Sequence, residues 1–255
     1  MTSMLEGVDY LPSLDETALY LRENPKMDDL LYVGGSLNPR AVIGGYAKGL
    51  FPMFIGRDED ETIGWFSPQQ RVGLDLTPFH GVSSKIRVHR SLEHSMRRFI
   101  LRVNTNFRAV LEACASSREV GNWIESRFIE VYCELHDAGL AHSFEIYLAQ
   151  EPDRLVGGLF GVSVGGLFSG ESMFHFVSDA SKAAFVGSVA ILHQAGYHWI
   201  DGQWLTEHLL SLGMQETRRK DYLAKLPSLL EVQPTPLPTG EVIRSHADWL
   251  EIVTH

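Results

Sequence analysis

Cysteine is scarce in this sequence, and long hydrophobic runs are absent. Only Cys114 and Cys133 occur among the 255 residues, and they show neither a metal-ligand spacing nor an obvious disulfide framework. No segment approaches the roughly 18–20 consecutive apolar residues that a membrane-spanning helix needs. The first eleven residues are polar and acidic, without the basic and apolar regions of a signal peptide. We therefore expect a cytoplasmic protein with free thiols and no membrane partner.

A metal-ligand pattern is missing as well. The eleven histidines are scattered, and pairs such as His89/His94 and His193/His198 stand five residues apart. Helix residues share a face at spacings of three or four, so these pairs would not present two rings to one ion. The spacing predicts no metal site.

Basic residues are in the minority except in one segment. The net charge of −10 argues against a general nucleic-acid binder. Between Lys85 and Arg108, however, there are seven basic residues and a single acid, Glu93. A local basic patch on an acidic protein suits a specific contact with a polyanion. The alternative is a solvated helix face whose arginines pair with acids elsewhere.

The apolar periodicity predicts an α+β fold, because helices precede a set of strands that another helix crosses. Asn38 and Pro39 are a typical N-cap and first helical residue, and Gly165-Gly166 is a typical hairpin turn. Residues 50–54 read as a turn-rich apolar segment and 58–61 as an exposed loop. The predicted helices are 14–23, 39–48, 91–101, 107–115, 126–138, 179–195, 207–212 and 219–225. The predicted strands are 63–66, 72–76, 141–148, 155–164, 167–174 and 197–201.

Three regions follow from this order. Residues 1–80 are expected to form a small N-terminal domain and residues 81–232 the main domain. The tail, residues 233–255, begins with three prolines in six residues and is expected to be irregular.

The strand at residues 167–174 carries an acid among apolar residues. On a strand, Leu167, Ser169, Glu171 and Met173 would share one side, and by the same rule Asp201 and Gln203 would share a face. Burying a carboxylate is costly unless something binds it. The alternative is an edge strand whose Glu171 points into solvent.

Three familiar functional patterns fit poorly. Gly161-Val162-Ser163-Val164-Gly165 matches a nucleophile elbow, and Asp201 and His208 follow in hydrolase order. The elbow needs a strand, a sharp turn and a helix, whereas another strand is predicted here. Glu171 and Asp201 as the carboxylate pair of a glycosidase would leave Gln203 without a role. The glycines between residues 157 and 170 lack the Lys-Ser/Thr ending of a phosphate loop.

Seven short motifs, in order, give the sequence a family resemblance. Over about residues 30–225 it resembles the bacterial leucyl/phenylalanyl-tRNA–protein transferases. The motifs are Val33-Gly34-Gly35-Ser36-Leu37, Gly49-Leu50-Phe51-Pro52, Trp65-Phe66-Ser67-Pro68, Gly121-Asn122-Trp123-Ile124, Gly170-Glu171-Ser172-Met173-Phe174, Asp179-Ala180-Ser181-Lys182 and Asp201-Gly202-Gln203.

The resemblance implies a small N-terminal α/β domain and a C-terminal catalytic domain with a GNAT (acetyltransferase-like) fold. It implies transfer of Leu or Phe, and less well Met, from tRNA to a protein whose N-terminus is Arg or Lys. The product would be marked for N-degron proteolysis. No metal and no organic cofactor are implied.

It also implies residue roles. Asp201 and Gln203 would orient and deprotonate the attacking amine, and Glu171 would accept a hydrogen bond from the amine of the aminoacyl group. Trp65 and Trp123 would stack on the terminal adenosine. An apolar pocket would consist of Leu159, Phe168, Met173 and Phe185, each of which could equally be ordinary core. The acceptor-stem phosphates would contact Lys85, Arg87, Arg90, Arg97, Arg98 and Arg102.

Departures from the family pattern leave the donor preference open. Gly202 stands where Cys is usual, Asn122 replaces Thr, and Gly187-Ser188 replaces a bulkier apolar residue. Two other functions remain possible from the sequence. One is a catalytically altered binder of aminoacyl-tRNA or N-terminal degrons, and the other is a small-molecule acyltransferase that uses acyl-CoA.

Overall fold

The fold was taken from a computed structural model, which describes residues 29–56, 62–77, 80–117 and 124–254. The helix predicted at residues 14–23, the loop predicted at 58–61 and Trp123 lie outside these residues.

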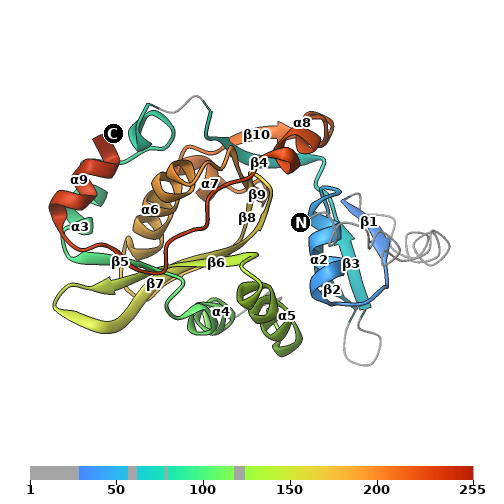
Figure 1. Cartoon of the computed structure of the whole chain (residues 1–255), viewed down its shortest axis with the longest axis horizontal. Coiled ribbons are helices and arrows are strands. Elements are labelled where there is room, and N and C mark those ends of the chain that lie inside the picture. Colours follow the sequence, from blue (N-terminus) through green and yellow to red (C-terminus); the bar gives the residue numbers. More distant parts are fainter. Residues whose placement is uncertain (1–28, 57–61, 78–79, 118–123, 255) are drawn as a thin grey trace.

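An eight-stranded sheet runs through the molecule (Figure 1). Neighbouring strands are antiparallel except β8 and β9, which are parallel. The strand order is β10 (Gln215–Arg218), β4 (Gln70–Asp75), β9 (Trp199–Trp204), β8 (Leu167–His175), β7 (Glu151–Val164), β6 (Ala141–Leu148), β5 (Phe99–Val103) and β11 (Gly240–Ile243). Most of β6 to β8 is buried, because helices cover both faces of the sheet.

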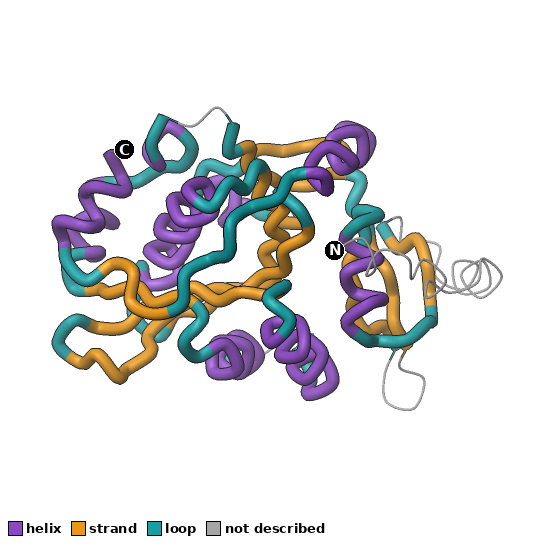
Figure 2. The backbone as a smooth tube through the Cα atoms, in the orientation of Figure 1, coloured by secondary structure: helices purple, strands orange, loops and turns teal. Residues whose placement is uncertain are grey.

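One face of the sheet packs against α6 (Ala180–Gln194), α3 (Arg90–Met96) and α9 (His246–Thr254). The other face packs against α4 (Phe107–Ser116) and α5 (Ser126–Asp137), as Figure 2 shows. Twelve residues of α6 are buried, so this helix is apolar around most of its circumference, as expected for a helix inside the protein. The short elements η3 (Val82–Ser84) and α7 (Glu207–Ser211), together with the longer helix α8 (Arg219–Glu231), complete the main body.

A smaller antiparallel sheet has the order β1 (Leu30–Val33), β3 (Thr62–Phe66) and β2 (Phe51–Ile55). It packs with α2 (Pro39–Tyr46), which begins as predicted, since the Asn38 side chain accepts a hydrogen bond from the Ala41 N–H. Residues of α2 and β2 share one hydrophobic cluster with α4 and α5. The small sheet is therefore joined to the main body through buried side chains.

The predicted α+β architecture is confirmed. The helices predicted at 39–48, 107–115, 126–138, 179–195, 207–212 and 219–225 are present, as are the predicted strands, with shifted ends. β4 pairs within the large sheet, although the predicted N-terminal domain extends to residue 80. The three domain boundaries stay a prediction.

Three local predictions were wrong. The helix predicted at 91–101 ends at Met96, and Phe99–Val103 is a strand whose backbone pairs with both β6 and β11. The segment predicted as turns at 50–54 contains β2. The tail is not irregular, since it supplies β11 and α9 and buries Trp249.

Candidate active site

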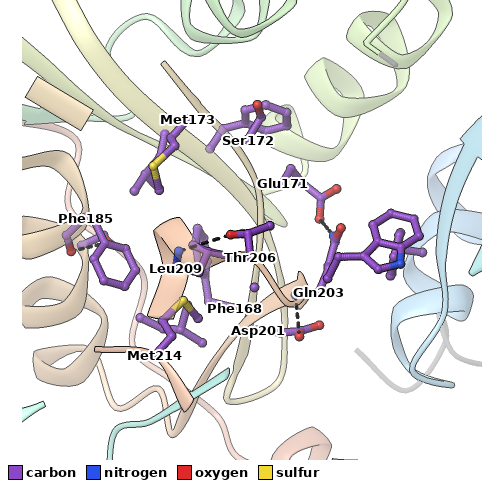
Figure 3. A pocket seen from close by; sticks show the side chains of 18 of the residues that line it. Phe168, Glu171, Ser172, Met173, Phe185, Asp201, Gln203, Thr206, Leu209 and Met214 are labelled. Atoms are coloured by element: carbon purple, nitrogen blue, oxygen red, sulfur yellow. Dashed lines mark hydrogen bonds between the residues drawn. The ribbon is translucent and has the colours of Figure 1, made fainter. Parts of the chain in front are cut away.

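A cavity of about 320 Å³ lies where β8 and β9 part. The two strands pair only from Leu167 with Trp199 to Ser169 with Asp201, although they continue to His175 and Trp204. Residues beyond the end of this short ladder, on both strands, line the cavity (Figure 3). The parallel pair therefore opens into a binding space at the middle of the sheet.

Each strand carries a β-bulge at this point. Opposite β7, Gly161 pairs with Gly170 and Phe160 with Ser172, so that Glu171 is the extra residue. Glycine is needed opposite, since a Cβ on Gly161 would lie 2.3 Å from the Ser169 carbonyl oxygen. Bulges of this kind re-aim side chains and are frequent beside active sites.

The bulge at Glu171 overturns the predicted alternation of β8. Leu167 packs in the cluster that contains Tyr222, whereas Met173 packs against the core beneath α6. One inserted residue moves every later side chain of the strand to the opposite face. Leu167 and Met173 therefore do not share a side, as the simple period had predicted.

The second bulge lies in β9 at Gly202, because Val72 pairs with Gln203 and Gly73 with Asp201. Gln203 takes a left-handed backbone conformation with φ 61°, which costs a non-glycine residue on the order of 1 kcal/mol. A Cβ on Gly202 would lie 2.8 Å from Val72 Cγ1, so the strand packs tightly behind the bulge.

The apolar end of the cavity gathers all four predicted pocket residues. Leu159, Phe168, Met173 and Phe185 line it, and they belong to or pack against the core cluster beneath α6. These four residues therefore line the pocket and also pack in the hydrophobic core, so both predicted alternatives hold. Ser188, which stands where the family pattern has a bulkier apolar residue, also lines the cavity. Sequence reasoning missed further wall residues, namely Phe51, Pro52, Met53, Ile200, Leu209 and Met214. The apolar pattern of one strand does not indicate which residues from distant segments of the chain will pack beside it.

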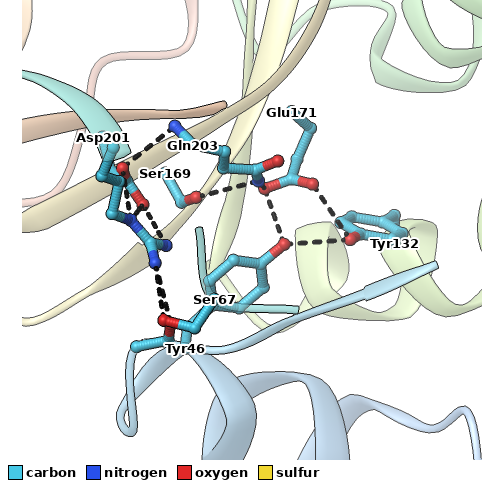
Figure 4. A network of polar contacts seen from close by, with 9 residues as sticks. Tyr46, Ser67, Tyr132, Ser169, Glu171, Asp201 and Gln203 are labelled. Atoms are coloured by element: carbon cyan, nitrogen blue, oxygen red, sulfur yellow. Dashed lines mark hydrogen bonds and ion pairs between the residues drawn. The ribbon is translucent and has the colours of Figure 1, made fainter. Parts of the chain in front are cut away.

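The polar end of the cavity is built around Glu171 (Figure 4). One of its oxygens accepts hydrogen bonds from Tyr46 Oη at 2.6 Å and Gln203 Nε2 at 2.9 Å, and the other accepts one from Tyr132 Oη at 3.3 Å. Burial raises the pKa of Glu171 to about 7, although the hydrogen bonds from Tyr46 and Gln203 act in the opposite direction. The predicted solvent-facing alternative for Glu171 is therefore wrong.

Asp201 forms an ion pair that the sequence did not reveal. Its carboxylate accepts three hydrogen bonds from the guanidinium of Arg71, the shortest being 2.7 Å, and both side chains are almost completely buried. Burial alone would lower the pKa of Arg71, but the Asp201 carboxylate raises it above its ordinary value. No feature of the sequence marks Arg71, since an arginine at the start of a strand usually reaches solvent.

Gln203 links the two carboxylates. Its backbone N–H donates to Asp201 Oδ1 at 3.0 Å, and its Nε2 donates to Ser169 Oγ at 3.3 Å as well as to Glu171. The three residues predicted to be catalytic are thus brought together in one network that borders the cavity.

Trp65, one of the two predicted stacking residues, does not line this cavity. Trp65 has no exposed surface, and its indole N–H donates to the Gly34 carbonyl oxygen inside the small sheet. Its position gives no support to stacking on a base. Trp123 lies outside the described residues.

The six basic residues predicted to bind tRNA do not lie on one helix. Lys85 and Arg87 follow η3, Arg90 begins α3, and Arg97 and Arg98 follow it. Arg102 is on β5 and pairs with Glu241 at 3.3 Å, so the alternative of arginines paired elsewhere holds for this residue. Arg98 donates to the Ser178 carbonyl oxygen at 3.3 Å.

The serine motif does not form a nucleophile elbow. Ser163 lies on β7, and a turn and another strand follow it; its Oγ accepts a hydrogen bond from Tyr197. Within the described ranges, no group of three His, Cys, Asp or Glu side chains is arranged to hold a metal ion. No helix in that part of the chain is long and apolar enough to cross a membrane.

One solved structure compared with this chain is only weakly similar to it. The structure of L-PGS from Bacillus licheniformis has a TM-score of 0.37 and 8% identity over 96% of this chain and 98% of that one. A similarity this low carries no weight, so the GNAT-like domain stays a prediction.

Comparison of sequences is decisive for the family. The model of the Leucyl/phenylalanyl-tRNA protein transferase family matches residues 82–227, and that of its N-terminal domain matches residues 35–69. The leucyl/phenylalanyl-tRNA–protein transferase of Anaeromyxobacter dehalogenans (strain 2CP-C) is 44% identical over 82% of this chain and 85% of its own. That of Sulfurimonas denitrificans is 43% identical over 78% and 83%. The chain therefore belongs to the leucyl/phenylalanyl-tRNA–protein transferase family, and it is an aminoacyltransferase.

Proposed function

We propose that the chain transfers Leu or Phe, and less well Met, from a charged tRNA to the N-terminal Arg or Lys of an acceptor protein in the cytoplasm. The modified acceptor would then be a substrate for N-degron proteolysis. The cavity is the observation that carries this proposal, because its apolar end adjoins the buried carboxylate of Glu171. An aminoacyl group has the same two parts, an apolar side chain and an amine on one carbon.

In this proposal the side chain of the donor occupies the apolar end, and its amine donates a hydrogen bond to Glu171. A carboxyl group with a pKa of about 7 ionises readily when a cationic amine arrives, because a nearby opposite charge favours its charged form. The hydrogen bonds from Tyr46 and Gln203 support this role, since they fix the orientation of the carboxylate.

The acceptor's neutral amine then attacks the ester carbonyl carbon. The bond from that carbon to the ribose oxygen breaks, the amine nitrogen loses a proton, and the ribose oxygen leaves as a hydroxyl after gaining one. We propose that Gln203 orients the attacking amine, with Asp201 acting through the Gln203 N–H that it accepts. Exchange of an ester for an amide is downhill, so orientation supplies much of the required acceleration.

The proposal is tested by transfer of labelled amino acids from a panel of charged tRNAs to peptides that differ in their N-terminal residue. We expect Leu and Phe as donors and Arg and Lys as acceptors. Glu171→Ala and Gln203→Ala should each lower kcat/KM by about 10- to 100-fold, the usual effect of losing a hydrogen bond to a charged group.

Ser163→Ala is the matched control, because Ser163 lies in the same sheet but outside the cavity wall. It should transfer normally, and loss of activity in this variant would favour the serine hydrolase. Tight binding of charged tRNA without turnover would identify a binder. Saturable binding of CoA would favour the acyltransferase.

A further inference from the structure

Arg71 joins four parts of the chain beside the polar end of the cavity. Its Nε and Nη2 donate to Asp201, and its Nη1 donates to the Gly49 carbonyl oxygen at 2.9 Å and to Ser67 Oγ at 3.3 Å. The guanidinium carbon lies 4.2 Å from the centre of the Tyr222 ring. The side chain therefore contacts the segment before β2, the turn before β4, the strand β9 and the helix α8.

Stability alone is a weak reason for such a pair. Removing two charges from water costs free energy that their attraction often fails to recover, and apolar residues of similar volume are frequently as stable. Here the exposed fractions are 1% for Arg71 and 0% for Asp201. A planar fork that satisfies both carboxylate oxygens does, however, fix the position of the carboxylate.

The carboxylate of Asp201 also contacts the backbone of Gln203. Asp201 Oδ1 accepts the Gln203 N–H at the bulge, where Gln203 has its left-handed φ of 61°. This backbone turn directs the Gln203 amide to Glu171. A strained backbone conformation persists only when surrounding interactions hold it. The hydrogen bond from the Gln203 N–H to Asp201 is such an interaction, and it is made by the strained residue itself.

We propose that Arg71 is a positioning residue for transfer, which holds Asp201 as a fixed anion so that Gln203 keeps the conformation that presents its amide at Glu171. Asp201 then exchanges no proton during turnover and acts only as an oriented charge. The inference rests on the proposed function for its kinetic readout. It revises the expectation that Asp201 takes part in deprotonation.

Among the residues that the structure describes, the charged and titratable groups that act on Asp201 come from three elements. They are Arg71 on β4, Tyr222 on α8 and Glu171 on β8. Arg71 is the sole cation among these, so without it two acids and a phenol would surround one another away from water. A buried carboxylate without a counter-charge takes up a proton.

Four variants test the inference in the transfer assay. Arg71→Gln should lower kcat by about 100-fold, the loss that a small misplacement of a reacting group causes, with little change in KM for the charged tRNA. Its rate should also show an added rise with pH as Asp201 ionises. Arg71→Lys keeps the charge, so it should lose less activity and lack the added ionisation. Arg154→Gln, at the exposed pair with Glu151, is the control and should behave as wild type.

The double variant Arg71→Gln/Asp201→Asn covers the case in which Arg71→Gln does not fold. With both charges gone it should fold, but its kcat should stay low. Recovery of wild-type kcat in the double variant, or an Arg71→Gln variant that retains full activity and the wild-type pH profile, would overturn the inference.

Thermal unfolding gives a readout that does not depend on transfer. Arg71→Gln should lower the melting temperature less at pH 5 than at pH 8, because protonation of Asp201 removes the uncompensated charge at low pH. An equal loss at both pH values contradicts the inference. If the wild-type chain shows no transfer, the proposed function is contradicted. Thermal unfolding at the two pH values then still tests whether Arg71 holds Asp201 as an anion.

Discussion

Glu171 combines a cost in stability with a role in the candidate active site. Burial raises its pKa from 4.5 to about 7. Between these pH values the folded chain holds a proton that the unfolded chain has released, so the free energy of unfolding falls as the pH rises. Glu171→Gln removes this fall. At pH 8 we expect the variant to be more stable than wild type by up to about 3 kcal/mol, and to be defective in transfer.

Denaturant unfolding at pH 4 and at pH 8 checks this prediction. The two proteins should be about equally stable at pH 4, where Glu171 is protonated in both states of wild type. The difference in the free energy of unfolding between the variant and wild type should grow between pH 4.5 and pH 7. A variant that is less stable than wild type at pH 8 would show that the ionised Glu171 is stabilised in the fold.

Some residues of the candidate active site could be predicted from the sequence, and others could not. An acid among apolar residues, Glu171, was recognisable because buried carboxylates need partners. Its partners Tyr46 and Tyr132 were not recognisable, since they come from α2 and α5, and a hydroxyl on a helix is equally common in solvent. Arg71 was missed for the same reason, because the feature that distinguishes it is burial against a distant strand.

Among the helices and strands, most were predictable and the two bulges were not. Apolar periodicity locates β8 and β9 because each strand contributes its own pattern. A bulge depends on two strands at once, as when Gly161 allows the chain to approach Ser169 so closely. The period-2 rule therefore failed where the two strands border the cavity.

The C-terminal tail is an integral part of the fold, although its prolines suggested otherwise. Trp249 on α9 is 1% exposed, and its indole N–H donates to the Phe99 carbonyl oxygen at 2.8 Å. Trp249→Ala should lower the free energy of unfolding by about 3–5 kcal/mol, as for other large buried aromatic residues. Leu250→Ala, at a neighbouring position that is 36% exposed, is the matched control for urea unfolding. Equal losses in the two variants would mean that α9 is not anchored by Trp249.

Over the whole molecule, one segment stands out by its charge. The protein is acidic overall, but seven basic residues and a single acid lie between Lys85 and Arg108. Within this segment Arg108 is bound by Glu130 and Arg102 by Glu241. Arg90 and Arg97 are exposed, and no ion pair to either is found in the described parts of the chain. We therefore expect these two arginines to contribute more to tRNA binding than the paired ones.

The dependence of tRNA affinity on salt tests this expectation, because each phosphate that an arginine neutralises releases counterions. The slope of log K against log salt should be negative for wild type. Arg90→Gln/Arg97→Gln should make it shallower by about 0.7–0.9 for each phosphate that is no longer neutralised. Arg108→Gln removes a charge that Glu130 already neutralises, so its slope should equal that of wild type. An unchanged slope in the double variant would assign tRNA binding to another surface. Because the net charge of the protein is −10, its affinity for tRNA depends on the location of the basic residues and not on their total number.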